Sequence, residues 1–186
     1  EKGSSELKYE VECDWQEKAV VGKSIPQLNF HIPVSFKTET YKYDVPFGSI
    51  IRKAFNQDVP ANSWMAAVNE EGSSAMLITK NKYGFRGYES SMAVTLIRSS
   101  YDPDPYPDNG IHKFSFAVSP VLIGSEKQLI SKAYMYNHPL SFISNTVHEG
   151  NLPLKKGFIE TICTNAVVSA IKIAEDLNDG IVLRVY

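Results

Sequence analysis

Three carboxylates stand close together in one proline-rich stretch, RSSYDPDPYPDNG, which runs from Arg98 to Gly110. Two carboxylates about 5 to 9 Å apart can hydrolyse a glycosidic bond, and Asp102, Asp104 and Asp108 could reach such spacings. The alternating prolines, however, are typical of a solvated turn that fixes φ and stops strand pairing. Because nothing in the sequence indicates the burial that raises a catalytic pKa, we interpret the stretch as a rigid loop that presents side chains.

A second stretch, NKYGFRG from Asn81 to Gly87, combines two cations and two aromatic rings with two glycines. It lacks the helix onset that would direct backbone N–H groups towards a phosphate, so a turn between strands is one interpretation. Its Lys82, Tyr83, Phe85 and Arg86 support another, because rings and cations beside flexible glycines can stack on a sugar and hydrogen-bond its hydroxyls. Both interpretations stay open at this point.

Metal and nucleophile motifs are missing from the sequence. The four histidines, at positions 31, 112, 138 and 148, have no second ligand at H-x-H, H-x-D or H-x-x-x-H spacing, although Glu149 follows the last. The chain also has neither a G-x-S-x-G elbow nor a G-x-x-x-x-G-K-[ST] phosphate loop. We therefore predict no metal site and no catalytic residue in this chain, and we interpret the histidines as packed or surface imidazoles.

The elements that position these stretches are predicted to be short strands. Alternating apolar residues predict half-buried strands, and two short apolar runs fit strands buried on both faces. A helix is expected over GSEKQLISKAYMY, with Ser125 as its cap and with Leu129, Ala133 and Tyr136 on one face. Hairpin turns are expected at NEEGS and at NDG, Asn178 to Gly180. The predicted strands are LKYEVECDW (7–15), LNFHIPVSF (28–36), YKYDVPF (41–47), WMAAV (64–68), AMLIT (75–79), SMAVTLI (91–97) and HKFSFAV (112–118).

This pattern predicts an all-β, mainly antiparallel fold, a large sandwich with one short helix. We expect one domain over 1–186, with a possible subdomain break near 150. The chain lacks an initiator Met and ends after an apolar run, so we expect it to be excised from a longer multidomain protein.

Composition narrows the class of protein. At 186 residues and 43% hydrophobic content, the chain can bury a core. A net charge of -2 leaves no basic stripe for nucleic acid, and no apolar run is long enough to cross a membrane. With Cys13 and Cys163 alone, and Cys13 in phase with the apolar residues of its strand, a disulfide framework is not expected. We therefore expect a soluble, cytoplasmic protein.

Several motifs in one fixed order resemble the C-terminal β region of the α-mannosidases of glycoside hydrolase family 38, and the match is closest to the bacterial branch. The order is NKYGF, AVTLIRSS, DPDP and DNGIHKFSF, and the similarity extends through YDVPFGSIIR, DVPANSWMAA, VVSAIKIAED and GIVLRVY. The residues that fit the family pattern are Lys82, Tyr83, Gly84, Phe85, Arg98, Ser99, Pro103, Asp104, Pro105, Asp108, Gly110 and His112.

The resemblance implies a retaining, zinc-dependent glycosidase that hydrolyses terminal α-mannosides. Its zinc ligands and its nucleophile lie in an N-terminal catalytic region that this chain lacks, so we expect the chain to be inactive alone. The expected partners are that catalytic domain and a mannose-containing oligosaccharide. The resemblance also implies that the loops around Arg98 approach the active site, with candidate substrate-binding residues Lys82, Tyr83, Gly84, Arg98, Asp104 and Asp108.

Two alternatives stay open. The chain could be a stand-alone carbohydrate-binding module, with Tyr83, Phe85, Tyr101 and Tyr106 as stacking platforms. It could also be a structural domain in which those rings face a partner. Sugar binding by the isolated chain would separate the module from the other two interpretations.

Overall fold

A computed structural model describes residues 3–69, 71–72, 74–104, 106, 108–121, 126–162, 166–176 and 180–186. Some sequence predictions concern residues outside these ranges. They are Gly124 and the cap Ser125 of the predicted helix, Glu70 and Ser73 of the NEEGS turn, the second cysteine Cys163, the motif residue Pro105, and Asn178 and Asp179 of the NDG turn.

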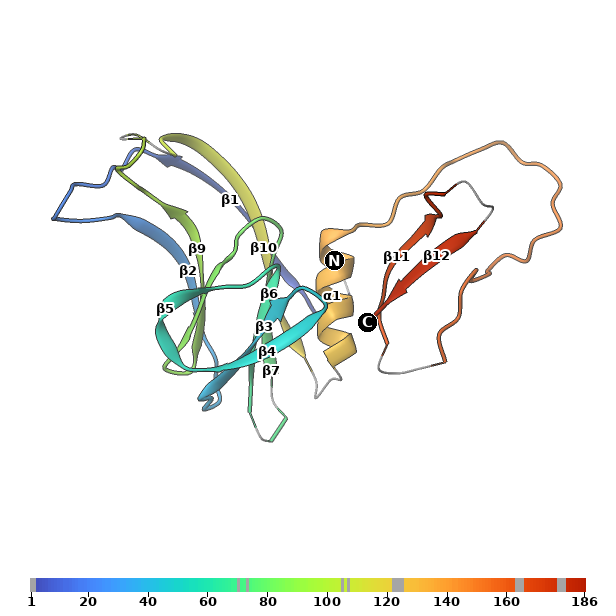
Figure 1. Ribbon diagram of the computed structural model, residues 1–186, viewed down its shortest axis with the longest axis horizontal. Helices are drawn as coiled ribbons and strands as arrows, with labels where there is room; N and C mark the ends of the chain where they lie inside the picture. Colours follow the sequence, from blue (N-terminus) through green and yellow to red (C-terminus); the bar gives the residue numbers. More distant parts are fainter. Residues whose placement is uncertain are drawn as a thin grey trace.

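The main body of the protein is a sandwich of two antiparallel sheets packed face to face (Figure 1). The six-stranded sheet has the order β1-β10-β7-β6-β3-β4, and the four-stranded sheet has the order β2-β9-β8-β5. The first sheet consists of β1 (Leu7–Trp15), β10 (Gly110–Val121), β7 (Ser74–Thr79), β6 (Trp64–Val68), β3 (Thr40–Val45) and β4 (Gly48–Lys53). The second consists of β2 (Gln27–Pro33), β9 (Ser91–Arg98), β8 (Gly84–Tyr88) and β5 (Phe55–Pro60). The predicted all-β sandwich is therefore confirmed.

The sandwich core lies between the two sheets. It is formed by side chains that alternate along the strands, and Tyr41, Met65, Phe85, Val94 and Phe116 are each at most 2% exposed. Cys13 packs against this core, as its phase in β1 predicted. The alternating stretches thus became strands because one face of each is removed from water.

The other face of the six-stranded sheet is covered by the helix α1 (Glu126–Asn137) (Figure 1). Leu129 and Ala133 are buried there against Trp64 of β6, and Tyr136 packs beside them, which confirms the predicted helix face. Strands β6 and β7 therefore have a core on each side. This explains why WMAAV and AMLIT are continuously apolar rather than alternating.

The stretch NKYGFRG is largely a strand and not only a turn between strands. Its residues from Gly84 onward form β8, which pairs with β9 on one side and with β5 on the other. Phe85 is fully buried in the sandwich core, so burial of this ring outweighs the weak strand preference of the neighbouring glycines. Two further strands, β4 and β5, were not among those that alternation predicted.

Beyond α1, residues 139–166 form no helix or strand where they are described, and they lead to a hairpin of β11 (Val168–Ile173) and β12 (Ile181–Val185) (Figure 1). Apolar side chains are fully exposed along this segment, among them Leu140, Phe142 and Leu154. The predicted break near 150 lies within it. No helix in the described ranges is long and apolar enough to span a lipid bilayer.

Candidate functional site

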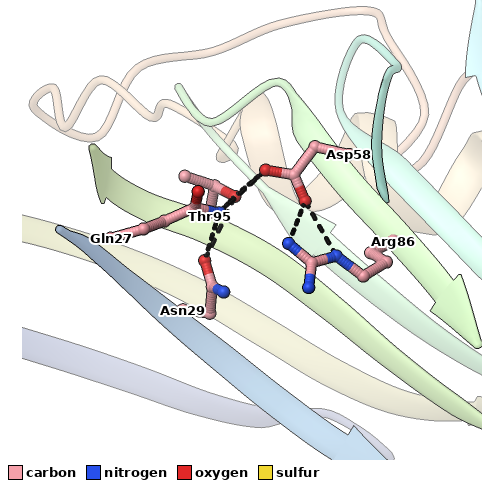
Figure 2. Close-up of polar contacts among 5 residues, drawn as sticks. All are labelled: Gln27, Asn29, Asp58, Arg86 and Thr95. Carbon is pink, nitrogen blue, oxygen red and sulfur yellow. Dashed lines mark hydrogen bonds and ion pairs between the residues drawn. The ribbon is translucent and has the colours of Figure 1, made fainter. Parts of the chain in front are cut away.

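A group of polar side chains lies on the outer face of the four-stranded sheet (Figure 2). We call the group of Gln27, Asn29, Asp58, Arg86 and Thr95 the polar face. Three strands are aligned by their register, which pairs Asn29 of β2 with Thr95 of β9, and Ala93 of β9 with Arg86 of β8. Since alternate residues of a strand point to the same side, these polar residues project away from the core that Phe30 and Val94 help to form.

Asp58 is the central acceptor of the polar face. Its Oδ1 accepts two hydrogen bonds from the Arg86 guanidinium, from Nε at 3.1 Å and from Nη2 at 2.9 Å. Its Oδ2 accepts from Thr95 Oγ1 at 2.5 Å and from Gln27 Nε2 at 2.8 Å. Burial would raise the pKa of Asp58, but the hydrogen bonds from Thr95, Arg86 and Gln27 and the charge of Arg86 outweigh it and hold that pKa below its ordinary value. Asp58 is therefore a fixed anion rather than a proton donor.

The amide side chains complete the network on β2. Gln27 Nε2 lies 2.8 Å from Asn29 Oδ1 and 2.7 Å from Thr95 Oγ1. Thr95 Oγ1 lies 3.2 Å from the same oxygen of Asn29. The group thus presents carboxylate, guanidinium, hydroxyl and amide functions side by side, which is the mixture of donors and acceptors that recognises sugar hydroxyls or a polar protein surface.

Two of the residues predicted from the sequence belong beside the polar face. A Cβ on Gly84 would lie 3.5 Å from Thr95 Cβ and 3.7 Å from Asp58 Oδ2, so Gly84 borders the network directly. Arg98 is exposed and is the register partner of Gln27, which places both on the same side of the sheet.

Two other predicted residues, Lys82 and Asp108, interact with each other. Burial lowers the pKa of Lys82, and the charge of Asp108 opposes that effect. The Lys82 ammonium also lies 4.8 Å from the ring centroid of Phe114 in β10. Asp108 has a φ of 62°, and its carbonyl oxygen lies 2.6 Å from His112 Nε2, so a side-chain contact holds this left-handed turn.

The remaining predicted residues have local roles in the structure. Tyr83 is 61% exposed, while its carbonyl accepts from Ala61 N at 3.0 Å. Asp104 Oδ1 accepts from the backbone N of Tyr106 at 2.8 Å, an aspartate turn within the proline-rich loop. Phe85 is buried, so the interpretation of this ring as a stacking platform was wrong.

Sequence reasoning did not predict a role for Gln27, Asn29, Asp58 or Thr95, and it noted Arg86 only as part of NKYGFRG. The polar positions between Leu28, Phe30 and Ile32 were a signal for an outer face on β2. Asp58 gave no such signal, because β5 lacks alternation and pairs with β8 through an irregular register. Within the described ranges, no three His, Cys, Asp or Glu side chains form a group that could hold a metal ion.

The family model "Glycosyl hydrolases family 38 C-terminal domain" matches residues 1–106, more than half of the sequence. The chain belongs to this family. The family 38 match includes all strands of the four-stranded sheet and therefore the whole polar face.

Curated relatives of this family 38 chain are α-mannosidases. Alpha-mannosidase G of Dictyostelium discoideum is 26% identical over 199 residues, which cover 98% of this chain and 17% of the relative. Alpha-mannosidase 2C1 of Homo sapiens is 27% identical over 148 residues, which cover 74% of this chain and 14% of the relative. The chain thus spans less than a fifth of the length of either relative.

Solved structures confirm the fold. An α-mannosidase from Enterococcus faecalis V583 superposes with a TM-score of 0.79 at 18% identity, over 98% of this chain and 22% of that chain. A family 38 protein from Enterococcus faecalis superposes with a TM-score of 0.78 at 19% identity, with the same coverage. At these identities the likeness concerns the fold.

Proposed function

We propose that the chain is the C-terminal β-domain of a retaining, zinc-dependent α-mannosidase that hydrolyses terminal α-mannosides in the cytoplasm. The observation that carries this proposal is the match of 98% of the chain to one part of a much longer α-mannosidase. In this proposal, the zinc ion and the nucleophile are held by other parts of the parent polypeptide. The isolated chain has no hydrolytic activity of its own.

The domain contributes to the substrate cleft through one end and one face of the four-stranded sheet. Arg98 ends β9 on the side of the polar face, and the loop that follows it carries Asp104 and Asp108. Lys82, Tyr83 and Gly84 lead into the neighbouring strand β8. These residues position a mannose-containing oligosaccharide or the catalytic domain beside it, and none of them transfers a proton.

Kinetics of the full-length parent enzyme test the proposal. Arg98→Ala and Asp108→Asn should lower kcat/KM for an aryl α-mannoside at least tenfold, about 1.4 kcal/mol of transition-state binding, without changing the unfolding midpoint. Lys37→Ala is the matched control. Lys37 and its ion-pair partner Glu39 are both largely exposed, and both lie outside the loops of the proposed cleft. Unchanged kinetics in both variants would contradict the role of the cleft residues.

Two further measurements test the rest of the proposal. The proposed parent enzyme, with its catalytic region, should show zinc-dependent mannosidase activity, whereas the 186-residue chain alone should show none. Cell fractionation of the parent enzyme tests its cytoplasmic location. Activity of the isolated chain would overturn the proposal that it is inactive alone. Activity of the full-length enzyme that a zinc chelator does not change would overturn the proposed zinc dependence.

A further inference from the structure

A pocket of about 410 Å³ opens on the side of the protein opposite the polar face. Its walls are the C-terminal half of α1, the start of β6, the end of β3 and the C-terminal tyrosine. We call it the helix pocket, and the side chains that define its chemistry are Asp44, Trp64, Lys80, Tyr134, His138 and Tyr186. The two sheets of the sandwich separate it from the polar face, while Lys80 of its lining is two residues from Lys82 of the proposed cleft.

The helix pocket contains one acidic and one basic side chain, Asp44 and Lys80. The Asp44 carboxylate is held in place because its Oδ2 accepts from Ser63 N at 2.9 Å and from Ser63 Oγ at 2.7 Å. Burial raises the pKa of Asp44, although the two hydrogen bonds from Ser63 oppose the rise. Lys80 supplies a cation to the same pocket. One acid and one base favour a ligand that carries no net charge but both donates and accepts hydrogen bonds.

Aromatic rings supply apolar surface around these polar groups. Tyr134 and His138 stack with ring centroids 4.1 Å apart, and Tyr134 is 54% exposed. His138 Nδ1 lies 3.1 Å from the Tyr134 carbonyl oxygen, so it donates that hydrogen bond and leaves Nε2 for another partner. Trp64 is 1% exposed and forms part of the pocket floor. The pocket thus offers flat apolar surface next to directional polar groups.

Two parts of the pocket wall are held by contacts within the protein. Asn137 Nδ2 donates to the carbonyl oxygens of Thr79 and Ala133, both at 3.1 Å, and so ties the end of α1 to β7. Tyr186 exchanges backbone hydrogen bonds with Val167, and its ring lies edge-on to Phe47 at 5.7 Å. Burial raises the pKa of Tyr186, and the charges of Asp44 and Glu126 add to the rise. A preformed site loses less entropy on binding.

We propose that the helix pocket binds a neutral pyranoside as an ancillary sugar site. A pyranose ring has an apolar face for the exposed aromatic pair, and its hydroxyls can donate to Asp44 and accept from Lys80. The volume is in the range of about 300–1,000 Å³ that small-ligand pockets occupy. The proposal uses only the geometry of this pocket and does not depend on mannosidase activity.

Titration of the 15N-labelled chain with methyl α-D-mannopyranoside tests the proposal. The backbone amides of Ala133, Asn137 and His138 should show saturable shifts, with a Kd in the millimolar range. Tyr134→Ala removes the exposed ring from a surface position and should weaken binding about tenfold, the effect of one lost ring contact. Asp44→Asn, which keeps an acceptor for Ser63, should weaken binding without unfolding the domain.

Controls separate this site from the others. Tyr83→Ala, in the proposed cleft, should leave the affinity of the helix pocket unchanged. The proposal is overturned if the pocket amides do not shift, if they shift equally in Tyr134→Ala, or if tetramethylammonium or acetate binds there in place of the sugar. Shifts confined to the amides of Tyr83 and Tyr101 would also overturn it and would support sugar binding at the cleft end. Because turnover is not measured, failure of the kinetic tests on Arg98 leaves this experiment unaffected.

Discussion

The ring of Tyr41 lies directly against Gly87, so closely that a Cβ on Gly87 would stand 2.4 Å from Tyr41 Cδ2. Tyr41 belongs to β3 of the six-stranded sheet and Gly87 to β8 of the four-stranded sheet, so this contact joins the two layers. The ring is 1% exposed, and the close packing of protein interiors leaves a buried ring little room to move. A glycine at position 87 is therefore a packing requirement of the sandwich.

Gly87→Ala should accordingly lower the free energy of unfolding by about 1–3 kcal/mol, the usual cost of overpacking a core. Urea unfolding followed by circular dichroism measures the change. Gly48→Ala is the matched control, since a Cβ at Gly48 would meet no atom within 4 Å. Its stability should stay within about 0.5 kcal/mol of the parent. Equal midpoints for the two variants would show that the layers can separate to admit a methyl group.

Ser99 anchors the start of the proline-rich loop. Its Oγ accepts from Trp15 Nε1 at 3.0 Å and lies 3.1 Å from the Glu17 carbonyl oxygen, and the residue is 1% exposed. Ser99→Ala leaves the buried indole N–H of Trp15 and the part-buried carbonyl of Glu17 without their partner and should cost about 1–3 kcal/mol in unfolding free energy. Urea unfolding with tryptophan fluorescence as the probe measures this. The neighbouring Ser100 is exposed, so Ser100→Ala should be nearly silent.

The anionic Asp58 makes stability depend on pH. Because the pKa of Asp58 is lowered from 3.8, its ionised form stabilises the fold above that value, and the contribution is lost as pH falls through the lower folded-state pKa. Asp58→Asn should therefore be destabilised by about 1 kcal/mol at neutral pH, and this deficit should shrink as the pH falls below 3.8. Urea midpoints across that range measure it. A deficit independent of pH would mean that the charge of Asp58 does not matter; the exposed Glu39→Gln is the control.

The interaction of Lys82 with Asp108 can be measured directly. Since the charge of Asp108 raises a Lys82 pKa that burial lowers, Asp108→Asn should lower the pKa of Lys82 further. NMR titration of the lysine 13Cε resonance follows this value. Asp104→Asn is the control, because the Asp104 carboxylate accepts from the Tyr106 backbone and belongs to a separate turn. A Lys82 pKa that is the same in both variants would contradict the pairing.

Much of the fold could be predicted because buried residues recur at regular intervals along the strands. In β1 and β10 the residues that face the core, such as Val11 and Phe114, alternate with polar ones, and in β6 and β7 both faces are covered. β5 could not be predicted in this way, because its residues are mostly exposed and it forms the edge of its sheet. β8 was missed because its glycines resemble a turn. One of them, Gly87, is required by the ring of Tyr41, which is distant in the sequence.

In the candidate site, too, residues within a local sequence motif could be predicted, whereas residues brought together from different strands could not. Lys82 and Asp108 were proposed from local motifs, and the structure brings them together. The polar face instead joins residues from four strands, and the Gln27–Asp58 bond alone spans 31 positions in the sequence. No local pattern encodes such a pairing, because it depends on the order of strands in the sheet.

Strand β6 contributes side chains to both hydrophobic cores. Along its backbone, Met65 and Ala67 belong to the core between the sheets, whereas Trp64 and Ala66 belong to the core beneath α1. A single extended peptide therefore serves as the common wall of both cores, and neither can loosen without disturbing the other. The sandwich and the helix should melt in one calorimetric transition, and a ligand held against Trp64 should raise the melting temperature of the distant polar face as well.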